Sequence, residues 1–334
     1  MHNLSKLFIG TVLFFGHCSC YGYMATGLNM AYNRVGGFGK LLKLILTCEE
    51  LKVKGEIIHV NHSLPPPRPD FGITAEDMRY FLPHSLLALC TANQVASRNC
   101  FCEGKFENAK HFRNESLDAQ AVIAADPNRK VIVVSIRMTV SDKNWDTNYR
   151  ADLVPHPLLQ SHQKVHQGHL EHFLALRKQL VPAIVTMLRN PEYKDYSLHI
   201  SGFSLGASVS AISLPFWIRD LNSNKLENKI QLFTYSGPRP GNLEFARHLE
   251  SLGLPLFRYV KRGDVVPHVP DQFVQYSQVG QEFYDFSGPI MSQPPSKCAN
   301  NLIEDPKCAL KNDKYMATHH LTPFHRPIPI PPFC

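Results

Sequence analysis

At residues 196–208 the chain reads Tyr196-Ser197-Leu198-His199-Ile200-Ser201-Gly202-Phe203-Ser204-Leu205-Gly206-Ala207-Ser208. The part up to Ile200 is an apolar run typical of a buried strand, and the residues after Ser204 favour a helix to about Arg219. Between them lies the pattern G-x-S-x-G, which places a serine on a tight turn between a strand and a helix. Gly202 and Gly206 remove the side chains that would collide in such a turn. The bare pattern also fits a glycine-rich turn with a structural serine, but its position between strand and helix predicts Ser204 as a nucleophile.

Strands and helices alternate around this turn. Residues 130–136, 230–235 and 256–260 are apolar runs typical of buried strands. Residues 168–188 have the apolar spacing of a helix, with one face formed by Leu170, Phe173, Leu174, Leu176, Leu180 and Ile184. Because strands that alternate with helices form largely parallel sheets, we predict an α/β protein of the α/β-hydrolase fold, with a mostly parallel central sheet flanked by helices.

A nucleophilic serine needs a histidine as base and a carboxylate to orient that base, and in α/β hydrolases they follow in the order Ser, Asp, His. Asp264 comes directly after the strand at 256–260, at the sheet edge where active sites gather, although an aspartate in an ordinary surface turn would look similar. His319, His320 and His325 lie together near the end of the chain. The spacing alone does not choose among these histidines.

The N-terminal segment predicts export. Lys6 precedes the apolar run 7–15, and Cys18, Ser19 and Cys20 follow it, as in a signal peptide over residues 1–20. A membrane anchor would need about 20 apolar residues, so we expect no stable anchor. Residues 21–72 form a compositionally distinct region that ends in Leu64-Pro65-Pro66-Pro67-Arg68-Pro69, which indicates a pro-segment and a stiff linker. A catalytic domain is expected over residues 73–334, in a secreted, extracellular protein.

The composition bounds the remaining possibilities. A hydrophobic content of 44% is ample for a core, and the net charge of +7 is dispersed without a basic run, so nucleic acid is not an expected partner. Asn61 and Asn114 begin glycosylation sequons that a eukaryotic host could use. The spacing of His166, His169 and His172 could suggest zinc, but a solvated helix surface is the preferred interpretation, so no metal is expected.

From about Leu86 to Cys334 the chain resembles the class 3 lipases, and the secreted lipases of filamentous fungi most closely. Three segments carry the resemblance: Thr234-Tyr235-Ser236-Gly237-Pro238-Arg239-Pro240-Gly241-Asn242, then Asp264-Val265-Val266-Pro267-His268-Val269-Pro270, and finally His319-His320-Leu321-Thr322-Pro323-Phe324. The last two are similar to the motifs that bear the family's catalytic aspartate and histidine. The resemblance therefore implies a triad of Ser204, Asp264 and His320, with His320 preferred over His319.

The resemblance also implies residues around the triad. Ser135-Ile136-Arg137-Met138-Thr139 occupies the place of the family's oxyanion-hole segment, so the amide of Thr139 is expected to act beside that of Leu205. Trp145 falls where these lipases carry a lid, and the lid is expected over residues 140–153. Met138 stands where relatives have glycine and Phe203 where most have histidine, so Met138 is expected to reshape the acyl pocket.

The cysteines resemble a three-bridge scheme of the fungal enzymes. Nine are present, and Cys18 and Cys20 fall in the expected signal peptide. The resemblance implies the pairs Cys90–Cys334, Cys100–Cys102 and Cys298–Cys308. The middle pair has only one intervening residue, which strains such a ring, and Cys48 is left over.

The function implied is that of a secreted triacylglycerol lipase, acting as a monomer on a lipid or ester substrate at a lipid–water interface without metal or organic cofactor. A phospholipase A1 or a feruloyl-type esterase would use the same residues. A catalytically silent lipid-binding protein that keeps the fold is the alternative from another class, prompted by Met138 and Phe203.

Overall fold

The computed structural model describes residues 63–64, 66–90, 106–287, 293–311, 315, 317–325 and 328. The expected signal peptide, residues 21–62 and the Cys100–Cys102 pair lie outside the described residues, so they stay predictions. No helix within the described ranges is long and apolar enough to cross a membrane.

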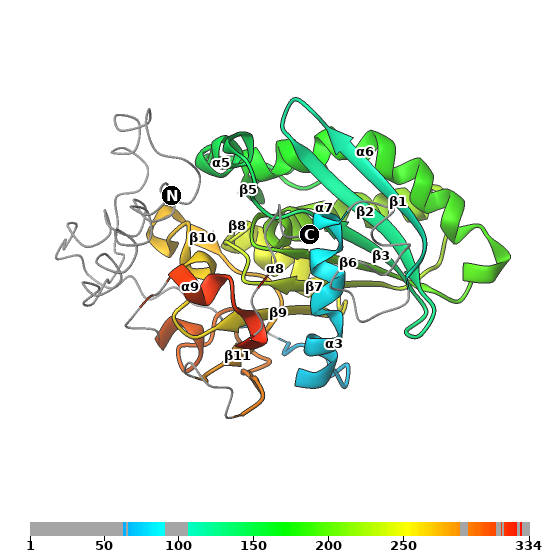
Figure 1. Cartoon of the computed structure of the whole chain (residues 1–334). Helices are drawn as coiled ribbons and strands as arrows, with labels where there is room; N and C mark the ends of the chain where they lie inside the picture. The colour runs from blue at the N-terminus through cyan, green and yellow to red at the C-terminus, as the bar shows by residue number, and fades with distance from the viewer. Residues whose placement is uncertain are drawn as a thin grey trace, which may run out of the picture.

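An eight-stranded sheet forms the centre of the fold, in the order β1-β2-β3-β6-β7-β9-β11-β12 (Figure 1). The strands are β1 (Glu107–Asn114), β2 (Ala119–Asp126), β3 (Val131–Ile136), β6 (Ser197–Phe203), β7 (Ile230–Tyr235), β9 (Leu256–Lys261), β11 (Gln281–Asp285) and β12 (Ser296–Lys297). The pairs from β3 to β11 are parallel, whereas β1, β2 and β12 pair antiparallel with their neighbours. The predicted mostly parallel sheet is thus confirmed, and the antiparallel β1–β2 hairpin is an addition to it.

A second, four-stranded sheet lies in the order β10-β8-β5-β4. Its short strands are β4 (Leu153–Pro155), β5 (Lys164–His166), β8 (Gly241–Asn242) and β10 (Tyr276–Ser277). The α-helices of the described ranges are α3 (Ala75–Leu86), α5 (Asp142–Tyr149), α6 (Gln167–Leu188), α7 (Leu205–Ser223), α8 (Leu243–Ser251) and α9 (Ala317–His320). Short 3₁₀ turns are Leu87–Leu89, Pro191–Tyr193, Val266–His268, Gln272–Val274, Ala309–Lys311 and Pro323–His325.

Helices cover both faces of the large sheet, because its central strands are apolar on both sides. In β3, Ile132 and Val134 pack with α6 and α7, whereas Val131 and Val133 pack with α3. This is the alternation expected of successive side chains in a strand. Figure 1 shows α3 crossing one side of the strands and α6 on the other.

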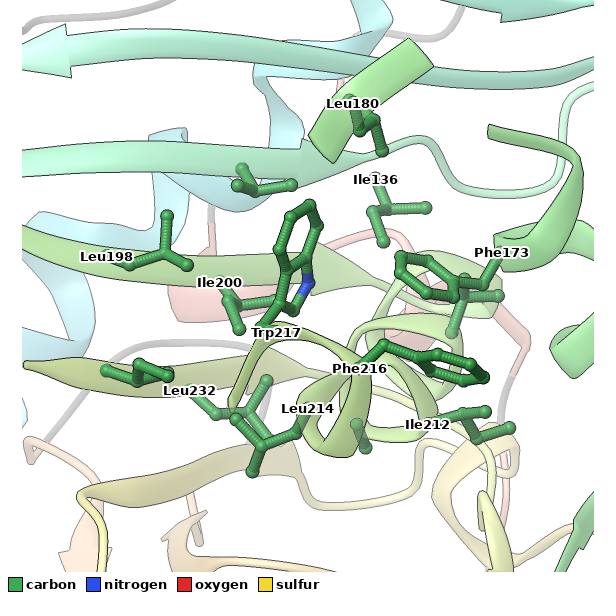
Figure 2. Close-up of a cluster of buried hydrophobic side chains, with 14 of the residues drawn as sticks. Ile136, Phe173, Leu180, Leu198, Ile200, Ile212, Leu214, Phe216, Trp217 and Leu232 are labelled. Carbon is green, nitrogen blue, oxygen red and sulfur yellow. The ribbon is translucent and has the colours of Figure 1, made fainter. Parts of the chain in front are cut away.

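The largest apolar cluster of the described residues lies between the sheet and the α6–α7 pair, around Trp217. Its indole is 1% exposed, packs edge-on against the ring of Phe173, and donates through Nε1 to the Ser213 hydroxyl at 3.0 Å. Figure 2 shows this ring beside Ile136 and Ile200, which come from adjacent strands. Burying a large apolar side chain of this kind contributes about 1.5–3 kcal/mol, so this cluster holds α7 firmly on β6.

Helix α6 confirms the predicted element at 168–188 but corrects two details of it. Leu174 was expected on the apolar face and is instead 38% exposed. His166, His169 and His172 were expected on a solvated surface, yet each is only 1% exposed. The first turn of α6 lies under α5 and beside the small sheet, and this tertiary cover removes the three imidazoles from water.

The end of the expected linker is packed against the body of the protein. The Arg68 guanidinium donates to both Glu250 carboxylate oxygens at 2.6 and 2.8 Å, and to the Leu302 carbonyl at 2.6 Å. The backbone of Leu64 and Arg68 also donates to the carbonyls of Asn301 and Asn300. The described residues 63–64 and 66–68 therefore lie against the surface of the domain.

One of the implied disulfides is present. Cys298 and Cys308 are joined, and their Cα atoms are 6.4 Å apart. Cys90 is buried and disulfide-bonded, while Cys334 lies outside the described residues, so the Cys90–Cys334 pairing stays a prediction.

Candidate active site

The turn between β6 and α7 presents Ser204 in a backbone conformation that is rare for a residue with a side chain. Its φ is 55° and its ψ is −124°. Gly202 and Gly206 permit this turn, because a Cβ on Gly202 would lie 2.3 Å from the Gly206 carbonyl oxygen. Such conformations cost about 1–3 kcal/mol and persist where the surroundings hold them, often at functional sites. Here α7, packed onto the sheet, supplies that support.

The structure brings Ser204, His320 and Asp264 together. His320 Nε2 lies 2.9 Å from the Ser204 Oγ, and His320 Nδ1 lies 3.1 Å from each carboxylate oxygen of Asp264. Asp264 is fully buried, His320 is 3% exposed and Ser204 is 7% exposed. A carboxylate can only accept, so Nδ1 carries the proton and Nε2 is left to accept the serine hydroxyl. This arrangement can remove a proton from Ser204.

The neighbouring His319 points elsewhere. Its Nδ1 lies 2.6 Å from the Arg262 carbonyl oxygen, to which it donates. Of the two histidines that end α9, His320 is therefore the one that reaches Ser204, as the resemblance implied.

Two side chains from β9 hold the segment that carries His320. Lys261 is 2% exposed, and its Nζ donates to the Thr322 carbonyl at 2.7 Å and to the Thr322 hydroxyl at 3.0 Å. Burial lowers the pKa of Lys261, against the opposing effect of the nearby Asp285 and Asp264 carboxylates. The Tyr259 hydroxyl accepts from the Phe324 backbone N–H at 2.9 Å. Strand β9, which leads to Asp264, therefore also holds the segment that follows His320.

The amide of Leu205 occupies the first position of α7, where backbone N–H groups have no partner within the helix. These groups and the helix dipole favour negative charge beside Ser204. The end of β3 lies against the same turn, because a Cβ on Gly206 would be 2.0 Å from the Ile136 carbonyl oxygen. Thr139 follows three residues after Ile136, and its hydroxyl accepts from the Asn148 amide at 3.0 Å.

Met138 and Phe203, the two departures from the family pattern, are both buried. They belong to one apolar cluster on the α3 face of the sheet, with exposures of 6% and 0%. The Phe203 ring centroid lies 5.1 Å from that of His320. Met138 is thus a core residue as well as a neighbour of the site, so its removal would leave a cavity.

Helix α5 is the segment expected as a lid. Trp145 is partly buried and packs on Val265 and Val266, directly after Asp264 in the chain. The inner side of the helix is polar: the fully buried Asn144 donates from Nδ2 to the carbonyls of Leu117 and Asp118, each at 3.1 Å. The helix is therefore attached by its tryptophan on one side and by the β1–β2 turn on the other.

The residues that sequence reasoning did not find are Asn148 and Ser208. The His169 imidazole joins them, with Nδ1 2.7 Å from the Ser208 hydroxyl and Nε2 3.2 Å from Asn148 Oδ1. These residues are far apart in the chain, so no spacing could indicate the contact. Burial lowers the pKa of His166 to about 3 and that of His169 well below its usual range, so both imidazoles are neutral.

Within the described residues, one group has the donor atoms to hold a metal ion, Glu282 with Cys298 and Cys308. Its two sulfurs form the disulfide, so they are not thiolate ligands.

The chain is similar to several known lipases. The family described as Lipase (class 3) matches residues 133–274. The "Lipase" of Rhizomucor miehei is 29% identical over 170 residues, which cover 50% of this chain and 45% of that protein. The "Secreted mono- and diacylglycerol lipase 1" of Fusarium solani is 25% identical over 233 residues, which cover 65% of this chain and 66% of that protein. The crystal structure of a lipase from Rhizopus microsporus var. chinensis is 24% identical, with a TM-score of 0.63, covering 80% of this chain and 97% of that one.

The chain thus has the α/β-hydrolase fold. Its resemblance to the class 3 lipases is confirmed, and the matched range includes most of β3, α5, the Ser204 turn and Asp264. His320 follows that range. The chain spans about half to two thirds of the length of these two curated relatives.

Proposed function

We propose that this protein hydrolyses carboxylic esters of lipids, with Ser204 as nucleophile, His320 as general base and Asp264 as the carboxylate that orients the base. The observation that carries the proposal is the continuous hydrogen-bonded line from Ser204 Oγ through His320 to Asp264, with all three groups nearly or fully buried. A buried line of this kind on a strained strand–helix turn is the arrangement that activates a serine.

In the first half of the reaction, Ser204 Oγ attacks the ester carbonyl carbon while its proton passes to His320 Nε2. The resulting imidazolium is stabilised by Asp264, which remains ionised. His320 then gives the proton to the leaving alcohol oxygen, and an acyl-enzyme remains on Ser204. In the second half, His320 takes a proton from water, the hydroxide attacks the acyl carbon, and the acid leaves as Ser204 regains its proton.

Negative charge develops on the carbonyl oxygen in each half. The Leu205 N–H stands at the first position of α7 and is a donor for that charge, as the helix geometry favours. We assign the second donor to the Thr139 amide. The approach of the β3 end to Gly206, two residues after Ser204, supports this assignment.

The proposed substrate is an acylglycerol at a lipid–water interface. The enzyme that hydrolyses it is proposed to be secreted. The names of the relatives support this choice, since one is a secreted mono- and diacylglycerol lipase. We take α5 as the lid over Ser204, because its Trp145 packs on the residues that follow Asp264. An apolar side chain at such a contact can exchange it for a lipid surface.

The test is a titration of released acid from emulsified tributyrin, phosphatidylcholine and methyl ferulate. Wild-type protein should hydrolyse tributyrin fastest, and Ser204→Ala should release no acid from any of the three. Preferential hydrolysis of phosphatidylcholine or methyl ferulate would keep the mechanism and move the substrate to a phospholipid or a feruloyl ester. No hydrolysis of any substrate by the folded wild-type protein would overturn the proposal in favour of a catalytically silent lipid-binding protein.

A further inference from the structure

A chain of polar side chains runs under the proposed lid, from the oxyanion-hole threonine to the nucleophile helix. Asn148, on α5, donates from Nδ2 to the Thr139 hydroxyl oxygen at 3.0 Å. Its Oδ1 lies 3.2 Å from His169 Nε2, and His169 Nδ1 lies 2.7 Å from the Ser208 hydroxyl. Ser208 stands on α7 four residues after Ser204. Three elements therefore meet on His169: the lid helix, the first turn of α6 and the nucleophile helix.

The direction of these hydrogen bonds follows from Ser208. Its side chain is 1% exposed, and His169 Nδ1 is the partner of its hydroxyl among the residues that the structure describes. A buried hydroxyl proton needs an acceptor, so Ser208 donates to Nδ1. His169 then carries its proton on Nε2 and donates to Asn148 Oδ1, which turns the Asn148 amide nitrogen toward Thr139. In the reverse direction, the Ser208 proton would be buried without an acceptor.

His166 holds the same asparagine from its backbone side. His166 Nδ1 accepts from the His169 backbone N–H at 3.3 Å, so its Nε2 carries the proton and donates to the Asn148 carbonyl oxygen at 3.2 Å. The two imidazole rings stack with their centroids 3.6 Å apart and their planes 5° apart. Asn148 is thus fixed by both histidines, one on its main chain and one on its side chain.

The orientation of the Asn148 amide determines whether the Thr139 hydroxyl accepts or donates in their hydrogen bond. When Asn148 Nδ2 donates to its oxygen, the hydroxyl keeps its own proton to donate elsewhere. If the Asn148 amide were rotated so that Oδ1 and Nδ2 exchanged places, the Thr139 hydroxyl would donate its proton to Asn148 Oδ1. The orientation of one amide therefore decides whether the threonine side chain is a donor at the site.

We propose that His169 is a positioning residue: together with Ser208 it fixes the orientation of the Asn148 amide, which leaves the Thr139 hydroxyl proton free to donate to the substrate carbonyl oxygen. The inference rests on the proposed function, since it assigns a role within that oxyanion hole. It adds a link between the lid helix and the nucleophile helix that runs through one neutral imidazole.

The test compares steady-state kinetics of tributyrin hydrolysis by variants of the full chain. His169→Phe keeps the ring volume and removes both hydrogen bonds, so kcat should fall about tenfold to a hundredfold with KM little changed, as small misplacements of a donor do. His169→Gln places an amide N–H near the position of Nε2 but removes the acceptor of the Ser208 hydroxyl, so its kcat should lie between those of His169→Phe and wild type. Ser208→Ala removes a single hydroxyl and should lower kcat in the same direction as His169→Phe.

A double-mutant cycle separates positioning from general destabilisation. Thr139→Val removes the hydroxyl and should lower kcat by about 10²- to 10³-fold, the usual effect of losing an oxyanion donor. In that background, His169→Phe should cause little further loss, because the group that it positions is gone. A structural role would instead give losses that multiply.

His156 offers a matched control. It is another buried histidine, 1% exposed, whose Nε2 donates to the Ile212 carbonyl on the same helix α7 at 3.2 Å, without contact to Asn148. His156→Phe should lower the melting temperature and leave kcat within about twofold of wild type.

The outcomes are distinct. If wild type is inactive, the proposed function fails and His169 has no catalytic step to serve. If wild type is active but His169→Phe and Ser208→Ala keep full kcat, or if the His169→Phe and Thr139→Val losses multiply, the positioning role is overturned while the proposed function stands. Should His169→Phe not fold, the cycle is run with Ser208→Ala, in which only one oxygen atom is removed.

Discussion

Gly206 lies so close to Ile136 that a Cβ on the glycine would be 2.0 Å from the isoleucine carbonyl oxygen. The contact joins the start of the nucleophile helix to the end of the adjacent strand β3. It brings together the two segments that would supply the oxyanion donors, the Leu205 amide and the region of Thr139.

This contact predicts the effect of Gly206→Ala. The added methyl group must push α7 away from backbone atoms of β3, which costs about 1–3 kcal/mol and displaces the turn that holds Ser204. We expect a reduced free energy of unfolding and a loss of kcat of more than a hundredfold, measured by urea denaturation and tributyrin hydrolysis. Ser210→Ala is the control, since it removes a buried hydroxyl of the same helix that has no hydrogen-bond partner in the described part of the chain. Equal activity of Gly206→Ala and wild type would contradict the prediction.

The paired histidines give a second prediction. His320→Ala removes the group 2.9 Å from Ser204 Oγ and should lower kcat by about 10⁴-fold or more. His319→Ala removes a side chain that bonds to the Arg262 carbonyl rather than to Ser204, and it should retain kcat within about tenfold. Circular dichroism should find both variants folded. If His319→Ala proves the inactive one, the assignment of the base is wrong.

Buried neutral histidines predict acid sensitivity. Burial lowers the pKa of His156 and of His268 to about 4. Below pH 6.5 these histidines are protonated in the unfolded chain but stay neutral in the native state. The free energy of unfolding therefore falls as the pH drops from 6.5 toward 4, by about 1.4 kcal/mol per pH unit for each such histidine. Above pH 6.5 these groups should contribute no pH dependence.

Urea denaturation at pH 7.0, 6.0 and 5.0 measures this slope. His156→Phe should make it shallower than the slope of the wild-type protein by about 1.4 kcal/mol per pH unit. A slope that is the same in His156→Phe and wild type would show that this imidazole is not held neutral.

Trp145 predicts the response to an interface. Its contact with Val265 and Val266 holds α5 down beside Asp264, and a lipid surface offers the indole an alternative apolar environment. Activity should rise disproportionately once tributyrin passes its solubility limit, and Trp145→Ala should blunt the rise. Asp146→Ala, an exposed change on the same helix, should leave it intact. A plain hyperbolic curve in all three proteins would indicate a static α5 and a soluble-ester substrate.

Local signals predicted the centre of the fold. The strands β3, β6, β7 and β9 are apolar runs of ordinary strand length, so their positions could be predicted without knowledge of the tertiary structure. The sequence did not predict the hairpin of β1 and β2, because β2 is the alanine-rich segment Ala119–Asp126 and β1 is largely polar. Their strand state depends on the pairing of β1 with β2 and of β2 with β3, which a local sequence pattern does not indicate.

The site divides in the same way. Ser204 could be predicted because the glycines that its turn requires lie two residues before and two residues after it in the chain. Asp264 and His320 could be predicted from the Ser, Asp, His order of α/β hydrolases and from the family motifs. His166, His169 and His172 were misjudged, since imidazoles at near-helical spacing look like a solvated face until α5 and the small sheet cover them. The Asn148–His169–Ser208 contacts arise only from that packing.

The central claim is that Ser204 is an activated nucleophile, and a fluorophosphonate probe tests it most directly, because such probes label a serine only when its proton can be removed. Wild-type protein at pH 7.5 should take up one probe per chain, with the label on the tryptic peptide that contains Ser204, and Ser204→Ala should take up none. A folded wild-type protein that stays unlabelled, or labelling that persists in Ser204→Ala, would contradict the account.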